Sequence, residues 1–432
     1  MQERLVILAG LRTPFCKAGT DLADMTADDL AVAVSKALLA RTGIDPKEID
    51  EAIFGCVGQP IEAANIARVI ALRAGLDERT PAVTVHRNCA SGAEAVTQAY
   101  EKMVAKRGEL FLVGGCESMS NYPLLFQQGT AEKIGAIMKA KTAYDRAQGL
   151  LKFRPHDILP RVALKLGLTD PVCGLNMGET AELIGREAPI TREAMDRYAL
   201  ESHARAEAAR ERFAAEISPV YPEPDPDKGQ SGSTPVVLDN GIRPHGTYEK
   251  LAKLSPIFER GTGTVTAGNS SQVTDGAVAL LVSSERKAAE LGITPLGTLA
   301  GYAYAGCNPS RMGLGPVYAL DAAEKRTGFK LSDADLVEIN EAFAAQVLAC
   351  LHALDDPDFN REFLGRDTPI GAPSTDIVNV NGGAIALGHP VGATGARLVL
   401  TTLLELGRRS QHRAVVTACV GGGQGMALWL ER

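Results

Sequence analysis

Apolar residues along the chain follow two periodicities, which predict strands alternating with helices. Short apolar, β-branched runs are typical of buried strands. They occupy residues 5–10, 83–85, 277–283 and 414–418. Elsewhere apolar residues recur every three or four positions, as on the buried face of an amphipathic helix. This pattern covers residues 30–41, 91–103 and 398–408. Such alternation predicts an α/β fold with a mostly parallel sheet covered by helices.

The same order of segments occurs twice along the chain. Leu8-Ala9-Gly10 reappears as Leu299-Ala300-Gly301, and Cys89-Ala90-Ser91-Gly92-Ala93 has the counterpart His389-Pro390-Val391-Gly392-Ala393. Two further matches join residues 48–53 to 338–343 and residues 112–115 to 416–419. Because the four matches are collinear, duplication explains them better than chance. A pseudo-twofold relation between the halves would place Cys89 opposite His389, with Asn340 and Cys419 nearby.

The part of the chain between these repeats has no counterpart in the second half, and we interpret it as an insertion. The first half then comprises residues 1–118 and 255–290, the inserted loop domain residues 119–254, and the second half residues 291–432. The insertion contains helical patterns over residues 128–151 and 191–215. Its proline-rich run at residues 219–226 cannot be helical and predicts an extended surface loop.

Charge and composition exclude several classes of protein. The 432 residues carry a formal net charge of −7 without a long basic run, so a nucleic-acid-binding footprint is absent. No apolar stretch approaches the roughly 18 residues that a transmembrane helix needs. The first apolar run is short and ends in Gly10-Leu11-Arg12-Thr13, unlike a signal peptide. We therefore expect a cytoplasmic protein.

The eight cysteines indicate a reducing compartment and no metal. They form no paired CxxC spacing, which argues against structural zinc. Cys89 lies where a strand leads into a helix, and the helix N-terminus favours a thiolate over a thiol. Its pKa is then expected to fall from ~8.5 toward neutrality, as in a nucleophile. The alternative for Cys89 alone is a small buried apolar residue, which describes most free cysteines.

Four motifs together decide between these alternatives, and they resemble the thiolases, the acetyl-CoA acyltransferases, over essentially the whole chain. They are Asn88-Cys89-Ala90-Ser91-Gly92, Asn340-Glu341-Ala342-Phe343-Ala344, Gly388-His389-Pro390, and Cys419-Val420-Gly421-Gly422-Gly423. Residues 263–271 are similar to the thiolase segment that lines the CoA site. The helical part of the insertion is similar to that of the thiolase β-subunits of fatty-acid-oxidation complexes.

This resemblance implies the thiolase fold and the cleavage of a 3-ketoacyl-CoA by CoA, the reverse of a Claisen condensation. Such cleavage requires a nucleophile, a base, an acid for the departing enolate and stabilisers of negative charge. Cys89 is then the nucleophile that carries the acyl group as a thioester. His389 is the base for Cys89 and for the incoming CoA thiol. Cys419 protonates the acetyl-CoA enolate, or removes the α-proton in condensation.

The resemblance also assigns supporting roles and a cosubstrate. Asn340 is expected to hold a water that cradles the enolate oxygen together with His389. The backbone N–H groups of Cys89 and Gly421 would form a second oxyanion hole. Coenzyme A is the cosubstrate, with Arg243 near its nucleotide end and Ser271 near its pantetheine, and no prosthetic group is implied.

Two residues depart from the usual thiolase pattern. His86 replaces a common Asn; because it precedes Cys89 by three residues on a strand, alternation points it to the other face, and we interpret it as structural. Asn176 stands where many thiolases have a His before Met-Gly. Asn340, which lies inside an otherwise helical pattern, favours ordinary thiolases over the complex-bound β-subunits, many of which carry His there.

Other functions and partners stay open at this level. A ketosynthase of the same fold lacks an equivalent of Cys419, and a silent lipid-carrier or scaffold subunit should lose Cys89, His389 or Cys419. An acetoacetyl-CoA thiolase working mainly in condensation is the main alternative. The expected assembly is a homodimer or homotetramer, with an enoyl-CoA hydratase/dehydrogenase α-subunit as a further candidate partner. Apolar residues of the insertion, such as Met138 and Phe153, are candidates for a tunnel that takes a long acyl chain; the alternative is an amphipathic segment that packs on its own domain.

Overall fold

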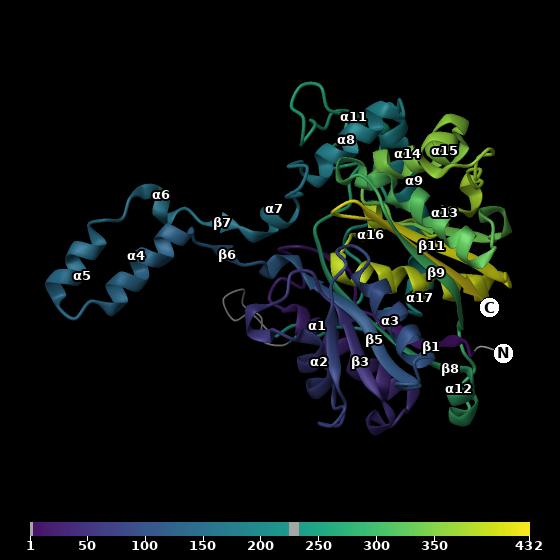
Figure 1. Cartoon of the computed structure of the whole chain (residues 1–432), viewed down its shortest axis with the longest axis horizontal. Helices are drawn as coiled ribbons and strands as arrows, with labels where there is room; N and C mark the ends of the chain where they lie inside the picture. The colour runs from purple at the N-terminus through teal and green to yellow at the C-terminus, as the bar shows by residue number, and fades with distance from the viewer. Residues whose placement is uncertain (1–2, 224–232) are drawn as a thin grey trace.

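The computed structural model describes residues 3–223 and 233–432, and in them one mixed sheet carries the fold (Figure 1). The strand order is β10-β11-β12-β9-β1-β8-β5-β3-β4, and β2 pairs with β8. The strands are β1 (Leu5–Arg12), β2 (Cys16–Lys17), β3 (Glu51–Gly55), β4 (Ala82–Val85), β5 (Leu110–Ser118), β8 (Thr274–Ser284), β9 (Gly297–Gly306), β10 (Leu336–Ile339), β11 (Arg413–Val420) and β12 (Gln424–Glu431).

The two halves of this sheet have the same topology. In the first half β3 is parallel to β5, and β8 then runs antiparallel between β5 and β1. In the second half β10 is parallel to β11, and β12 runs antiparallel between β11 and β9. The halves join where β1 pairs antiparallel with β9, Leu5 opposite Leu299 and Ile7 opposite Gly297. This arrangement confirms the expected α/β fold with duplicated halves.

Two details of the expected repeat are wrong. Among the described strands three pairings of this sheet are parallel and six are antiparallel, so the sheet is mixed rather than mostly parallel. A strand buried on both faces has a continuous apolar run whether it pairs parallel or antiparallel with its neighbours. The sequence pattern therefore does not distinguish the two kinds of pairing. The match of residues 48–53 to 338–343 is also out of register, because it pairs the start of β3 with residues 341–343, which follow β10.

Three helical layers enclose the two sheet halves. Helices α1 (Ala27–Thr42) and α2 (Ile66–Ala74) cover the outer face of the first half, and α13 (Gly315–Thr327) and α14 (Ala344–Asp355) that of the second. Helices α3 (Ser91–Val104) and α17 (Val391–Arg409) lie between them. Alternate residues of β8 face opposite layers: Leu281 packs with the outer helices and Leu280 with the central pair.

The central helices approach the sheet and each other through glycines. A Cβ atom on Gly115 of β5 would lie 2.0 Å from the backbone oxygen of Gly392, in the first turn of α17. A Cβ on Gly92 of α3 would lie 2.7 Å from the backbone nitrogen of Ala396. Both distances are shorter than any real contact, so only glycine permits this packing.

The insertion begins as an arm that leaves the body of the molecule and returns to it (Figure 1). The arm contains β6 (Leu124–Leu125), α4 (Gln128–Lys139), α5 (Ala143–Leu150), α6 (Pro155–Ile158) and β7 (Arg161–Val162). The helix expected over residues 128–151 is thus two helices, because α4 ends at Lys139 and α5 begins at Ala143. Its apolar side chains are largely exposed, 79% for Met138 and 85% for Leu151.

The rest of the insertion packs on the body and holds further helices. They are α7 (Ala163–Gly167), α8 (Met177–Glu187), α9 (Arg192–Ala208), α10 (Arg210–Phe213) and α11 (Tyr248–Ala252). Thr191 caps α9 as the pattern predicts, but the helix stops at Ala208. Of the proline-rich run, residues 224–226 lie outside the described residues. The remaining α-helices of the described residues are α12 (Glu285–Leu291), α15 (Pro357–Leu364) and α16 (Ala384–Leu387).

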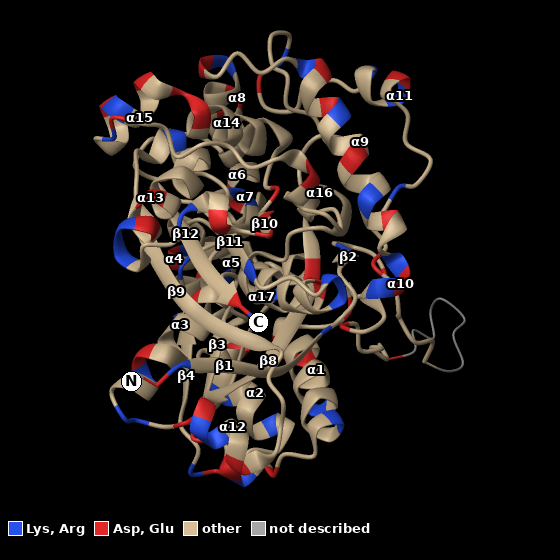
Figure 2. Cartoon of the chain, turned by 90° about the vertical axis from the view of Figure 1, so that its right-hand side faces the viewer, with Lys and Arg blue, Asp and Glu red and all other residues tan. Residues whose placement is uncertain are grey.

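Charged residues of both signs lie interspersed on helices at the surface, for example along α9 and α12, while the strands carry few (Figure 2). Among the described residues, no helix combines the length and apolar character required to cross a membrane.

The glycine contact at Gly115 makes a prediction about stability. Gly115→Ala should destabilise the protein by about 2 kcal/mol or more, because the methyl group overlaps a backbone atom that cannot move without α17. Gly135→Ala in α4 is the matched control: nothing lies within 4 Å of its Cβ position, and alanine is the better helix former. Thermal unfolding of both variants tests this. Equal melting temperatures for Gly115→Ala and wild type would contradict the tight packing.

Candidate active site

The nucleophile candidate lies in a tight turn between β4 and α3. Asn88 adopts a left-handed conformation, with φ of 43°, directly before Cys89. The hydroxyl of Ser91 closes the turn by accepting from the Arg87 N–H at 2.9 Å and donating to the Asn88 carbonyl at 2.7 Å. A strained non-glycine residue held by surrounding bonds is typical of functional sites. The turn places the half-buried Cys89 just before the N-terminus of α3.

Burial controls the acidity of Cys89. Desolvation raises the pKa of its thiol, while hydrogen bonds from the backbone N–H groups of Gly421 and of Cys89 itself lower it. Burial prevails, so the expectation of a lowered pKa from the helix end is wrong in direction. Because the thiol holds its proton, a neighbouring base is needed to form the thiolate.

His389 supplies such a base from the second half of the chain. Its Nδ1 lies 2.6 Å from the Thr394 hydroxyl, which donates its own proton to the Pro390 carbonyl at 3.1 Å. Nδ1 therefore carries the hydrogen and Nε2 keeps its lone pair. Burial, with a smaller contribution from the Arg397 cation, lowers the pKa of His389 to about 4. The imidazole is thus neutral near pH 7 and can accept a proton at Nε2.

Asn340 lies beside this histidine. It follows directly after β10, so its expected position inside a helix is wrong; its N–H donates to the Thr417 carbonyl at 2.9 Å. Its side-chain Nδ2 lies 3.5 Å from His389 Nε2. Its buried Oδ1 has no hydrogen-bond partner within the described part of the chain. An unpaired buried acceptor next to a neutral imidazole suits the binding of a small polar group.

Glu341 organises the loop that carries His389, a role that the sequence did not reveal. Its buried carboxylate accepts hydrogen bonds from Tyr198, Ser202, Asn379 and the backbone N–H of Ile385, at 2.6 to 3.1 Å. The available signal was an acidic residue two positions after the strand at residues 336–339, next to Asn340. These bonds fasten α9 and the residue 379–385 loop to the end of β10.

Cys419 approaches the same place from the end of β11. Burial raises the pKa of its thiol well above the ordinary value, so this thiol too is protonated near pH 7. The glycine turn after it allows left-handed backbone at Gly422 and Gly423, with φ of 91° and 82°. Asn88 Nδ2 donates to the Gly421 carbonyl at 2.7 Å, which ties this turn to the nucleophile turn.

A pocket of about 760 Å³ brings most of the candidates together. Cys89, His389, Cys419, Gly421 and Ser271 all line it. Its walls are mainly apolar, and on one side they come from the base of the insertion, at residues 163–172. The arm itself does not line this pocket, so the tunnel proposed for residues such as Met138 and Phe153 is wrong.

Of three further candidates, His86 lies elsewhere than the sequence suggested, and Asn176 and Arg243 keep their assignments untested. His86 lines the same pocket as Cys89, because β4 ends at Val85 and strand alternation no longer applies. Asn176 caps α8 by accepting from the Gly178 N–H at 3.0 Å. Arg243 is exposed and outside the pocket, with its backbone N–H bonded to His203.

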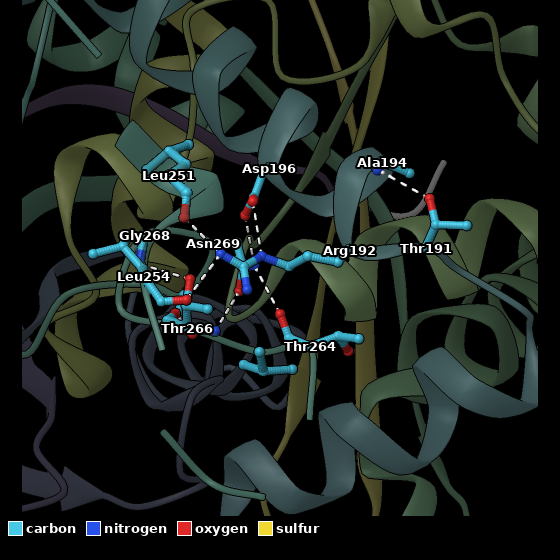
Figure 3. Close-up of polar contacts among 12 residues, drawn as sticks. Thr191, Arg192, Ala194, Asp196, Leu251, Leu254, Thr264, Thr266, Gly268 and Asn269 are labelled. Carbon is cyan, nitrogen blue, oxygen red and sulfur yellow. Dashed lines mark hydrogen bonds and ion pairs between the residues drawn. The ribbon is translucent and has the colours of Figure 1, made fainter. Parts of the chain in front are cut away.

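A buried polar cluster fixes the segment that carries Ser271 (Figure 3). Asn269 donates to Asp196 of α9 at 2.9 Å, and Arg192 binds the same carboxylate at 2.7 Å. Ser271 itself donates its backbone N–H to the Ala342 carbonyl at 3.0 Å. The pocket wall at Ser271 is therefore braced by α9 on one side and by the segment after β10 on the other. Among the described residues no cluster of His, Cys, Asp or Glu could hold a metal ion.

Comparison with known proteins now assigns the family. Residues 5–286 match the model of the thiolase N-terminal domain, and residues 293–432 match that of the thiolase C-terminal domain. The chain belongs to the thiolase family. It is 39% identical to a 3-ketoacyl-CoA thiolase of Aeromonas salmonicida and 40% identical to one of Pectobacterium carotovorum, with 99% of this chain and 97% of each relative covered.

Solved thiolases have the same fold. The acetyl-CoA acetyltransferase of Bacillus anthracis superposes with a TM-score of 0.86 at 35% identity, over 100% of this chain and 99% of the other. Human mitochondrial 3-ketoacyl-CoA thiolase gives 0.85 at 36% identity, over 100% and 99%. As a thiolase, the protein is an acyltransferase.

The accessibility of Cys89 makes a prediction about labelling. Iodoacetamide at neutral pH should alkylate Cys89 first among the eight cysteines, because it lines the pocket beside a neutral base, whereas Cys16, Cys56, Cys116, Cys350 and Cys419 are buried. Peptide mass mapping over time tests this. Cys173 and Cys307, which are also partly exposed, are the internal controls. Faster labelling of either one would remove Cys89 from the nucleophile role.

Proposed function

We propose that this thiolase cleaves 3-ketoacyl-CoA with free CoA to acetyl-CoA and a shortened acyl-CoA, through a thioester on Cys89. The observation that carries the proposal is the meeting of Cys89, His389 and Cys419 in one pocket. A silent carrier or scaffold would have no reason to keep two thiols and a neutral imidazole around the same cavity. The names of the curated relatives support 3-ketoacyl-CoA as the substrate.

In the proposed reaction, Nε2 of His389 takes the proton of the Cys89 thiol as its sulfur attacks the ketone. The carbon–carbon bond then breaks, leaving an acyl thioester on Cys89 and the enolate of acetyl-CoA. Asn340 and His389, with a bound water, stabilise the enolate oxygen, and the Cys419 thiol donates the proton that completes acetyl-CoA.

Before the second half-reaction, the proton held by His389 passes to the Cys419 thiolate, so the imidazole is neutral and Cys419 is a thiol again. His389 then takes the proton of an incoming CoA thiol, and the CoA sulfur attacks the thioester. The backbone N–H groups of Cys89 and Gly421, both of which already point toward the Cys89 sulfur, stabilise the tetrahedral oxyanion. Collapse of this intermediate breaks the bond to the Cys89 sulfur and releases acyl-CoA. The proton on His389 then returns to Cys89, so the thiol and the neutral imidazole are restored.

We infer that CoA lies along the wall formed by Ser271, with its pantetheine reaching the reacting residues. Met177 replaces Asn176 as the pocket-lining residue at the start of α8. Arg243 stays the candidate for the nucleotide end of CoA, because an exposed arginine can bind a phosphate that lies outside the pocket.

Each of the three units of the chain then contributes a different part of the site. The first half brings the nucleophile, the second the base and acid, and the insertion, residues 119–254, a wall.

Assembly and location complete the proposal. The edge strand β4 leaves Val83 and Val85 half-buried close to the nucleophile turn, which suits pairing with a second copy in a homodimer or a tetramer built from it. The exposed apolar residues of the arm suit contact with an α-subunit of an oxidation complex. We assign the protein to the cytoplasm.

The second candidate function is an acetoacetyl-CoA thiolase that mainly condenses, which the likeness to the Bacillus anthracis acetyltransferase favours. Thiolysis of acetoacetyl-CoA and of 3-ketohexadecanoyl-CoA, each with free CoA, separates the two. We expect a higher kcat/KM for the longer substrate, because each additional buried CH₂ contributes about 0.8 kcal/mol. A preference for acetoacetyl-CoA would assign the protein to the second class.

The separate roles of the two pocket thiols give a further test. Cys419→Ser should abolish condensation and the exchange of acetyl-CoA methyl protons, because a serine hydroxyl is far less acidic than a thiol. The Cys89 thioester should still form with acetyl-CoA in this variant, while Cys89→Ser should lose it. Wild-type exchange in Cys419→Ser would place the acid elsewhere.

A further inference from the structure

The active-site pocket is also lined by residues that take no part in the proposed chemistry. Ser271, Phe343, Met312 and Met177 are among them. Others are Val57 and Gly58 from the loop after β3, Tyr122, and Ala163, Leu164 and Leu166. Because the proposed function places pantetheine at Ser271, this last group supplies the candidates for contact with the acyl chain.

Tyr122 lies against the loop after β3 in unusually close packing. A Cβ atom on Gly58 would lie 1.9 Å from the Tyr122 ring at Cε1 and 2.2 Å from it at Cζ. The ring therefore occupies the space that any side chain at position 58 would need. One part of the ring packs on Gly58, while the residue also lines the pocket.

The buried Glu117 fixes the ring in this place. Its Oε1 accepts from the Tyr122 hydroxyl at 2.9 Å and from the Gly58 N–H at 2.7 Å. Its Oε2 accepts from the Val57 N–H at 3.2 Å and from the Gly392 N–H at 2.8 Å. One carboxylate thus holds Tyr122, the loop beneath it and the first turn of α17, just after His389. The ring keeps a fixed position relative to the base.

We propose that Tyr122, packed on Gly58 and held by Glu117, is the residue that selects acyl chains longer than acetoacetyl. The inference rests on the proposed function and adds the surface on which the acyl chain lies. Tyr122 is also the last residue but one before the arm begins at Leu124. The arm thus influences the pocket through its base, where Tyr122 and α7 face the same cavity.

The test compares kcat/KM for thiolysis of 3-ketodecanoyl-CoA with that of acetoacetyl-CoA, as a ratio within each variant. Loss of contact costs about fourfold for each CH₂ that is no longer buried. Tyr122→Ala should therefore lower the ratio at least tenfold, while Tyr122→Phe, which keeps the ring, should keep it within threefold. Tyr144→Ala on the exposed face of the arm is the matched control and should leave the ratio unchanged.

Gly58→Ala provides an independent test of the same contact. Its methyl group would displace the ring, so the ratio should fall in the wild-type background, but not further once Tyr122→Ala has removed the ring. The rate of Cys89 alkylation by iodoacetamide, measured without substrate, should stay near wild type in every variant and shows that the site is intact.

The possible results separate this inference from the proposed function. A wild-type protein that cleaves neither substrate overturns the proposed function, and the inference with it. Thiolysis by wild type together with an unchanged or raised ratio in Tyr122→Ala overturns the inference alone, as does an equal loss for both substrates. If Gly58→Ala lowers the ratio equally with and without the Tyr122 ring, the inference alone is likewise overturned.

Discussion

The approach of α17 to the end of β5 is the constraint on which the active site depends. Gly115 and Gly392 leave no room for a side chain between the strand and the helix, and the Glu117 carboxylate accepts the N–H of Gly392 at 2.8 Å. His389 lies three residues before that contact, and α3, which follows Cys89, packs on the same helix through Gly92. A helix displaced by the width of one methyl group would move the base away from the nucleophile.

Burial then determines the protonation states of Cys89 and His389, and with them the chemistry that the two residues can perform. It raises the pKa of Cys89 and lowers that of His389, so both groups are uncharged near pH 7. An ion pair formed in advance would leave both charges desolvated in the buried site, which disfavours it. A neutral thiol and a neutral imidazole exchange a proton as the sulfur begins to bond to an electrophile, so the thiolate need not form in advance.

Much of this site could be predicted from the sequence, and the failures have physical reasons. Cys89, His389, Cys419 and Gly421 meet in one pocket because each lies at a strand end or glycine turn that a local pattern marks. His86 was misplaced because strand alternation was extended past Val85, where β4 ends. The arm was misread as a tunnel because apolar periodicity does not distinguish a side chain that faces a cavity from one that faces a partner. Glu341 and Tyr122 escaped notice because their roles depend on residues far away in the chain.

The duplicated topology has a consequence for how such a site can arise. In a symmetric pair of identical halves, the position two residues before α3 and the position two residues before α17 would carry the same residue. Two cysteines or two histidines would then face each other. A nucleophile opposite a base requires the two copies to differ, and a single chain that contains both copies allows each to change alone. Residues 89 and 389, equivalent in the fold and different in chemistry, record that divergence.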